Sequence, residues 1–288
     1  MAAKRQRPGI LQGLVAAALR ERRIELSHSL AAYALNPTGD AVHDLRVALR
    51  RAEAAARLFK GFPAHGHGRE ARRLARDLRK SLSTHRQREV SLALVQTLRG
   101  ADPTAVEALA RLPHWASPDP KSVVASGRQL GSLLRRWALA SKDAPPGDDD
   151  LEALSRTLRR RLRKVRRKVL RYGIPTDRTL HRQRIAGKAL RYELELVMEL
   201  EPAADAIVKA SRGFQEALGQ AHDWDEACND LALWRDELPF ERRLAARPFL
   251  ARLALERRRA FRKARKEAAL FVKLLARTKL GKGWPGTS

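Results

Sequence analysis

Apolar residues recur every three or four positions through most of the chain, and these segments end at proline or glycine. This period is typical of amphipathic helices, and no segment has the clear alternation of a strand. The pattern therefore predicts an all-α fold. We expect Asp40 to cap the helix that ends at 59, Thr176 or Asp177 to cap the helix that ends at 201, and Asp223 to cap the helix that ends at 234. In the last helix we expect a kink or break near Arg247, before Pro248. The predicted helices cover about 10–35, 40–59, 68–84, 87–99, 104–112, 121–141, 151–172, 178–201, 203–218, 223–234 and 239–279.

One segment occurs twice, which divides the chain into two related halves. AVHDLRVALRRAEAAARLF at 41–59 aligns without a gap with TLHRQRIAGKALRYELELV at 179–197, at an offset of 138 residues. The alignment pairs the first histidine of each copy and the basic residues that follow it. We predict two helical bundles related by a pseudo-twofold axis, with a first half at 10–141, a linker at 142–150, a second half at 151–279 and a disordered tail at 280–288.

Each copy places its basic residues on a single helix face. At about 100° per residue, His43, Arg46, Arg50 and Arg57 fall within roughly 60° of one another, opposite the apolar positions. A bundle needs only the apolar face, so the repeated basic face calls for a function. The two faces could converge on one groove. The candidate polyanion-binding residues are His43, Arg46, Arg50, Arg57, Arg73 and Arg76 in the first half, and His181, Arg184, Lys188, Arg191, Lys209 and Arg212 in the second.

The charge of the chain indicates an anionic partner. The formal net charge is +27 and 45 of the 59 basic residues are arginine, whose guanidinium binds phosphate in a bidentate manner. A genome rich in Arg codons would account for part of the arginine bias, but it does not explain the net charge.

Composition and motifs argue against several other classes of protein. A single cysteine, Cys228, excludes an internal disulfide and fits a reducing cytoplasm, and no apolar stretch is long enough to span a membrane. We find no glycine-rich phosphate loop and no hydrolase or metal motif, so we expect no catalytic residues, no metal and no cofactor. Among the surrounding cations the two repeated histidines should be neutral, as donors in a binding surface. Asp223, Asp225 and Glu226 near His222 are interpreted as a helix-capping turn.

The spacing H-x-x-R-x-x-x-[RK], present twice in a basic helical chain, resembles the CHAD family, the conserved histidine α-helical domain. The resemblance covers roughly 10–278, and the second family signature is clear as ALGQAHDWDEA at 217–227 but eroded as SLSTHRQREV at 81–90, where Ser83 replaces glycine. It implies binding of inorganic polyphosphate in the cytoplasm. The E-x-E-x-K motif of the CYTH domain fused to many relatives is absent, which suggests a stand-alone binder.

Two alternatives stay open at this point. The chain could bind the RNA or DNA backbone without sequence preference, although single-stranded sites normally add stacking aromatic residues and the tryptophans here are scattered. It could also be a phosphate-ester hydrolase. For a polyphosphate binder we expect a role in targeting or coating polyphosphate granules, and any hydrolysis would come from a separate polyphosphate-metabolising enzyme.

Overall fold

The computed structural model describes residues 8–60, 62, 67–98, 102–111, 118–143, 148–199, 201 and 203–280, and within these ranges the regular structure is entirely helical. The all-α prediction is therefore confirmed. The helices are α1 (Pro8–Leu35), α2 (Gly39–Leu58), α3 (His67–Ser81), α4 (Ser83–Thr97), α5 (Pro103–Arg111), α6 (Pro120–Asp143), α7 (Asp148–Tyr172), α8 (Leu180–Glu195), α9 (Ala204–Glu237) and α10 (Phe240–Arg277).

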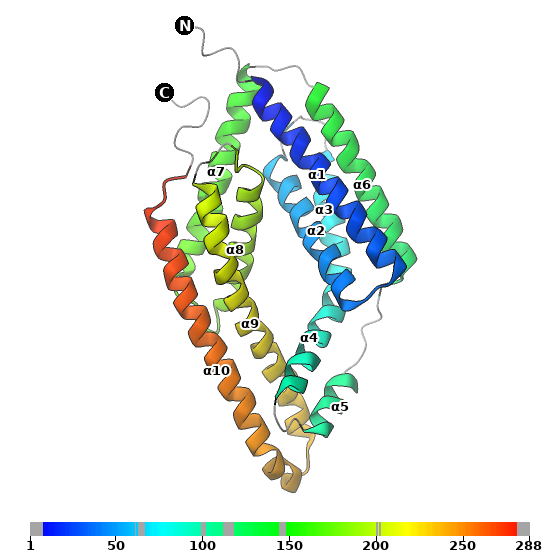
Figure 1. Ribbon diagram of the computed structural model, residues 1–288, viewed down its shortest axis with the longest axis vertical. Coiled ribbons are helices and arrows are strands. Elements are labelled where there is room, and N and C mark those ends of the chain that lie inside the picture. Colours follow the sequence, from blue (N-terminus) through cyan, green and yellow to red (C-terminus); the bar gives the residue numbers. More distant parts are fainter. Residues whose placement is uncertain are drawn as a thin grey trace.

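The helices form two bundles that meet along α2 and α8. The first bundle contains α1, α2, α3 and α6, and the second contains α7, α8, α9 and α10 (Figure 1). Helices α4 and α5 belong to the first half of the chain, yet they pack against the far end of α9. The two repeated segments, which are 138 residues apart in the sequence, therefore lie side by side.

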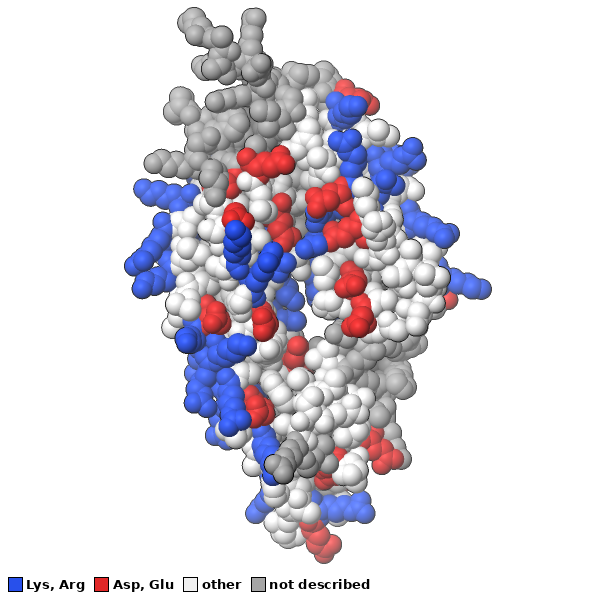
Figure 2. All heavy atoms as spheres, in the orientation of Figure 1, with Lys and Arg blue, Asp and Glu red and all other residues white. Residues whose placement is uncertain are grey.

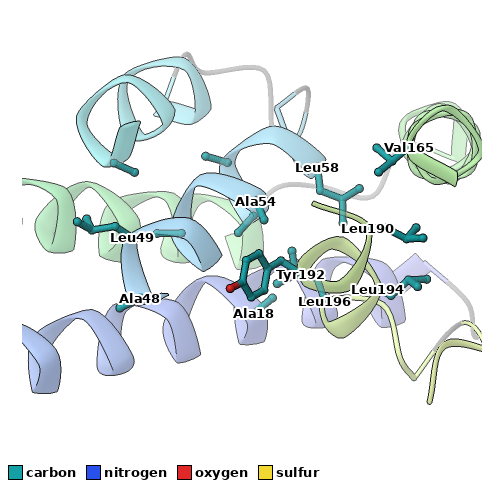
Figure 3. Close-up of a cluster of buried hydrophobic side chains, with 14 of the residues drawn as sticks. Ala18, Ala48, Leu49, Ala54, Leu58, Val165, Leu190, Tyr192, Leu194 and Leu196 are labelled. Atoms are coloured by element: carbon teal, nitrogen blue, oxygen red, sulfur yellow. The ribbon is translucent and has the colours of Figure 1, made fainter. Parts of the chain in front are cut away.

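One large hydrophobic core runs through both bundles. The apolar face predicted for the first repeat is buried, including Leu45, Leu49 and Ala52, and Leu190 and Leu194 of α8 belong to the same cluster. Figure 3 shows Tyr192 of α8 reaching into the region between α1 and α2. A second, smaller cluster joins α4 and α5 to α9 and α10 through Val95, Ala105, Leu109, Leu231, Trp234, Ala246, Phe249 and Leu253.

The prediction of a break before Asp223 was wrong, because α9 is continuous from Ala204 to Glu237. The buried positions Phe214, Leu218 and Ala221 continue at helical spacing into Ala227 and beyond, so the apolar stripe has no interruption. The corresponding place in the first half does break, since α3 ends at Ser81 and α4 begins at Ser83. The two halves therefore differ at this point.

The last helix contains a proline in its interior. Helix α10 continues through Pro248 without a break, although the proline ring has no amide hydrogen to donate to the preceding turn, and the alternative prediction of a kink there stays a prediction. In the same helix Leu270 is 57% exposed, whereas its neighbour Phe271 is buried.

The helix caps also differ from prediction. Thr38, rather than Asp40, caps α2, and its Oγ1 accepts a hydrogen bond from the Ala41 amide at 3.4 Å. Thr179, rather than Thr176 or Asp177, precedes α8. Asp177 instead pairs with Arg257 of α10, at 2.9 Å. Of the predicted linker, 144–147 lie outside the described residues, as do 281–288 of the predicted tail.

Candidate polyanion-binding site

The contact between α2 and α8 brings basic side chains of both halves together. Arg46 and Arg50 come from α2, and Arg184 and Lys188 come from α8. Burial lowers the pKa of Arg50, and the charge of Arg184 lowers it further. Burial also lowers the pKa of Lys188, to about 6, with further lowering by Arg184, Arg50 and Arg46. We call Arg46, Arg50, His181, Arg184 and Lys188 the basic cluster.

The mutual effect of these charges shows that the N-terminal parts of the two basic faces converge. Positive groups from opposite halves lower each other's pKa only when they are close and poorly shielded by water. Figure 2 shows Lys and Arg side chains beside a hollow near the centre of the molecule, between the two bundles of Figure 1. An anion placed in this cluster would relieve the repulsion.

The surroundings of the two histidines of the second half favour the neutral form of both rings. The rings of His181 and His222 lie edge to face with centroids 5.0 Å apart. Burial lowers the pKa of His222 to about 3, helped by the charge of Arg184. Burial and the neighbouring Arg184 and Lys188 lower the pKa of His181 as well. In the first half, His43 is exposed near the start of α2.

Two carboxylates on α9 partly balance the cluster. Burial lowers the pKa of Arg184, whereas Asp223 and Glu226 raise it. Glu226 also lies 3.7 Å from Nδ1 of His222. Sequence reasoning assigned these acidic residues to a capping turn. The unbroken apolar spacing of α9 was the signal that could have placed them on a helix face instead.

Arg46 is anchored at the break between α3 and α4, where its Nη1 donates to the Leu82 carbonyl at 2.5 Å. A neighbouring arginine that sequence reasoning did not choose, Arg79 of α3, also contributes. Its charge lowers the pKa of Arg50, and its Nε donates to Oε2 of Glu53 at 3.2 Å. Arg79 therefore extends the positive region from the basic cluster toward the middle of α2.

Arg57 and Arg191 do not occupy equivalent positions, because the 138-residue offset aligns Arg191 with Glu53 and Glu195 with Arg57. In α2, Arg57 Nη2 donates to Glu53 Oε1 at 2.9 Å. In α8, Arg191 Nε donates to Glu195 Oε1 at 2.7 Å. The two helices thus carry the same ion pair in opposite directions. Each arginine forms an ion pair with a carboxylate of its own helix, and neither belongs to the basic cluster.

The four candidates on α3 and α9 are exposed. Arg73 and Arg76 line a cavity of about 170 Å³ together with Lys60, Arg69 and Arg72. Lys209 pairs with Asp205 at 2.8 Å and its side chain is 70% exposed, while Arg212 is exposed one turn further along α9. The structure therefore places these four side chains on the surface of their helices.

The described residues contain neither a metal-binding group of side chains nor a membrane-spanning helix. No group of three or more His, Cys, Asp or Glu side chains there could hold a metal ion. Among the helices described, none is both long and apolar enough to cross a membrane. Burial raises the pKa of the Cys228 thiol to about 11, so this cysteine is in its unreactive protonated form.

Comparison with known proteins identifies the family. The CHAD domain model matches residues 17–232. The crystal structure of the CHAD domain from the plant Ricinus communis superposes with a TM-score of 0.65 at 20% identity, covering 93% of this chain and 92% of that chain. No curated protein matches. Because the family model spans most of the sequence, this chain belongs to the CHAD domain family.

Proposed function

We propose that this protein binds inorganic polyphosphate at the basic cluster between α2 and α8. The observation that carries the proposal is that the packing of α2 on α8 brings cations of both halves close together. Arg184 lowers the pKa of Arg50, and Arg50 in turn lowers the pKa of Lys188. CHAD domains bind polyphosphate in general, and this chain is a member of that family.

The chemistry of the cluster suits a linear chain of phosphates. Each guanidinium can donate two parallel hydrogen bonds to one phosphate, and neighbouring cations can hold successive phosphates. Neutral imidazoles such as His181 add N–H donors without adding repulsion in the free protein. We propose binding without a catalytic step, which is consistent with membership of a family of helical binding domains.

Binding of single-stranded nucleic acid is the main alternative, and the aromatic residues argue against it. Such sites stack bases on exposed rings beside a basic groove. Tyr192, the ring nearest the repeated basic faces in the sequence, is only 7% exposed and packs in the core. The Tyr192 ring is therefore not available for a base to stack on.

The first experiment is calorimetric titration at about physiological ionic strength, where non-specific attraction is weak. Long-chain polyphosphate is compared with tRNA at the same phosphate concentration. We expect tight binding of polyphosphate that tRNA does not displace. Equal binding of both, lost together as salt rises, would show that the positive charge acts as a general electrostatic surface.

The second experiment removes one arginine from each half. Arg46→Ala with Arg184→Ala is expected to lower polyphosphate affinity at least about 100-fold, because each charged hydrogen bond contributes roughly 1.5–3 kcal/mol. A matched control, Arg128→Ala with Arg135→Ala on the exposed face of α6, removes the same charge and should change affinity much less. Far-UV circular dichroism checks the fold, since Arg46 also holds the Leu82 carbonyl. Unchanged affinity in a folded double variant would refute the proposed site.

A cytoplasmic location at polyphosphate granules is part of the same proposal. In cells that accumulate polyphosphate, a fluorescent fusion of the protein should localise to the granules. The same fusion with Arg46→Ala and Arg184→Ala should be distributed evenly through the cytoplasm. Co-purification with the granules would then allow a search for a separate polyphosphate-metabolising enzyme as a partner.

A further inference from the structure

A second cavity, of about 190 Å³, lies between α7, α8 and the end of α2. It shares no residue with the basic cluster, and it differs in chemistry because cationic and apolar side chains line it together. Its lining consists of Arg57, Arg161, Lys164, Val165, Lys168, Tyr172, Arg182, Ile185, Ala186 and Ala189.

The apolar part of this lining is partly open to solvent. Val165 and Ala186 are buried, whereas Ile185 is 54% exposed and Tyr172 is half-buried. An isoleucine at this exposure, in a cationic cavity whose lining also includes an aromatic residue, offers contact area that no part of the described chain covers. A bound molecule with an apolar or planar portion would cover it.

Two of the cations are fixed in place by carboxylates behind them. Nε of Arg161 donates to Oε1 of Glu193 at 3.1 Å and Nη2 donates to the same oxygen at 2.8 Å, and the Glu193 side chain is fully buried. Arg57 is held by a single hydrogen bond, from its Nη2 to Oε1 of Glu53 at 2.9 Å. These guanidiniums are therefore oriented in advance, which reduces the entropy lost when a ligand binds.

The other three cations, Lys164, Lys168 and Arg182, are exposed at the rim. Within the described chain the lining contains no aspartate or glutamate, and the buried Glu193 behind it acts electrostatically on Lys168. Three exposed cations match the charge of a short run of phosphates. The volume is smaller than a site for a drug-sized molecule, so one end of such a ligand would extend into solvent.

We propose that this cavity is a separate site for a small phosphorylated ligand that carries a planar group, of the class of a nucleoside triphosphate. The phosphates lie along Lys164, Lys168 and Arg182, and the planar group covers Ile185 and Tyr172. The inference goes beyond polyphosphate binding and does not depend on it, because the two sites use different residues.

The test compares ATP with inorganic tripolyphosphate, which carries a triphosphate of similar charge but no base. In calorimetric titrations ATP is expected to bind about tenfold more tightly, which is about 1.4 kcal/mol and within the range of one stacked base. Saturation-transfer NMR is expected to show transfer to the adenine protons. Equal affinity for the two ligands together with no transfer to adenine would overturn the proposal.

Variants locate the site. Ile185→Asn is expected to remove the preference for ATP and leave tripolyphosphate binding unchanged, and the exposure of Ile185 makes this change compatible with folding. Lys164→Gln with Lys168→Gln should weaken ATP binding about tenfold or more. The control, Lys121→Gln with Lys142→Gln on α6, removes the same charge from exposed positions elsewhere and should have little effect.

The two proposals can fail separately. If the cavity is independent of the basic cluster, Arg46→Ala with Arg184→Ala retains ATP binding and loses polyphosphate. Loss of ATP binding in that folded variant would place ATP in the basic cluster and refute the separate site. Failure of polyphosphate to bind the wild-type protein, with ATP binding intact, would instead refute only the function proposed above.

Discussion

Lys188 determines how the basic cluster responds to pH. Its pKa is lowered from 10.5 to about 6 by burial and by Arg184, Arg50 and Arg46, and Asp223 opposes this only partly. In the free protein at pH 7.5 the amine is therefore mostly neutral. A bound polyanion adds negative charge beside it and raises its pKa, so the complex takes up a proton. We expect polyphosphate affinity to fall as pH rises from about 6 to 8.

Calorimetry in buffers of different ionisation enthalpy measures this proton uptake directly. At pH 7.5, Lys188→Met should take up fewer protons than the wild type, by as much as one, and should show a flatter dependence of affinity on pH. Lys142→Met is the control, because Lys142 is exposed on α6 and lies outside the candidate polyanion-binding residues. An unchanged proton uptake in Lys188→Met would contradict the assignment of the proton to this residue.

At the scale of single elements, the close packing of α8 on α9 depends on Gly187. A Cβ placed on Gly187 would lie 2.3 Å from Cε1 of Phe214, and that ring is stacked on Phe271 with centroids 4.5 Å apart. The repeat aligns Gly187 with Leu49, so the second half has the small residue where the first has a large one. In the second half, the Phe214 ring of α9 therefore packs directly on the backbone of α8, at a position where the first half has the leucine side chain of α2.

Gly187→Ala is consequently expected to destabilise the protein, by about 1–3 kcal/mol, because the buried and stacked Phe214 ring cannot move aside easily. Chemical denaturation monitored by circular dichroism measures the change. Gly131→Ala in α6 is a matched control, since nothing lies within 4 Å of its Cβ position. It should stabilise by about 0.5–1 kcal/mol through the higher helix propensity of alanine. A neutral or stabilising Gly187→Ala would show that α8 and α9 are packed less tightly than described.

The sequence predicted most helices because their apolar spacing is a local property. It could not tell that α9 continues where α3 and α4 separate, since leucine, glycine and acidic residues at 217–227 fit either a turn or a helix surface. The basic face of each repeat followed from helical geometry, whereas the meeting of Arg50 with Arg184 depends on how two distant helices pack. Composition also does not predict which arginines form ion pairs. The single carboxylate of Glu53 pairs with both Arg57 and Arg79.

At the scale of the whole molecule, the two halves are joined too extensively to be independent. One hydrophobic cluster contains residues of both bundles, and α4 and α5 of the first half pack against helices of the second. Arg51 of α2 adds a polar connection, since it pairs with Glu25 of α1 and lies 3.4 Å from Oε2 of Glu195 in α8. Unfolding of either half would expose the core of the other.

We therefore expect one calorimetric unfolding transition, with equal calorimetric and van't Hoff enthalpies, in spite of the internal repeat. Arg51→Met should lower the Tm of that transition by a few degrees without splitting it. The reason is that the half-buried carboxylates of Glu25 and Glu195 lose a positive partner, which costs about 1–2 kcal/mol. Arg136→Met, at an exposed position on α6, should leave the Tm nearly unchanged. Two separate transitions, in the wild type or in Arg51→Met, would mean that the bundles fold as separate units. The basic cluster would then form only when they dock, so polyphosphate would be expected to raise the Tm of both transitions together.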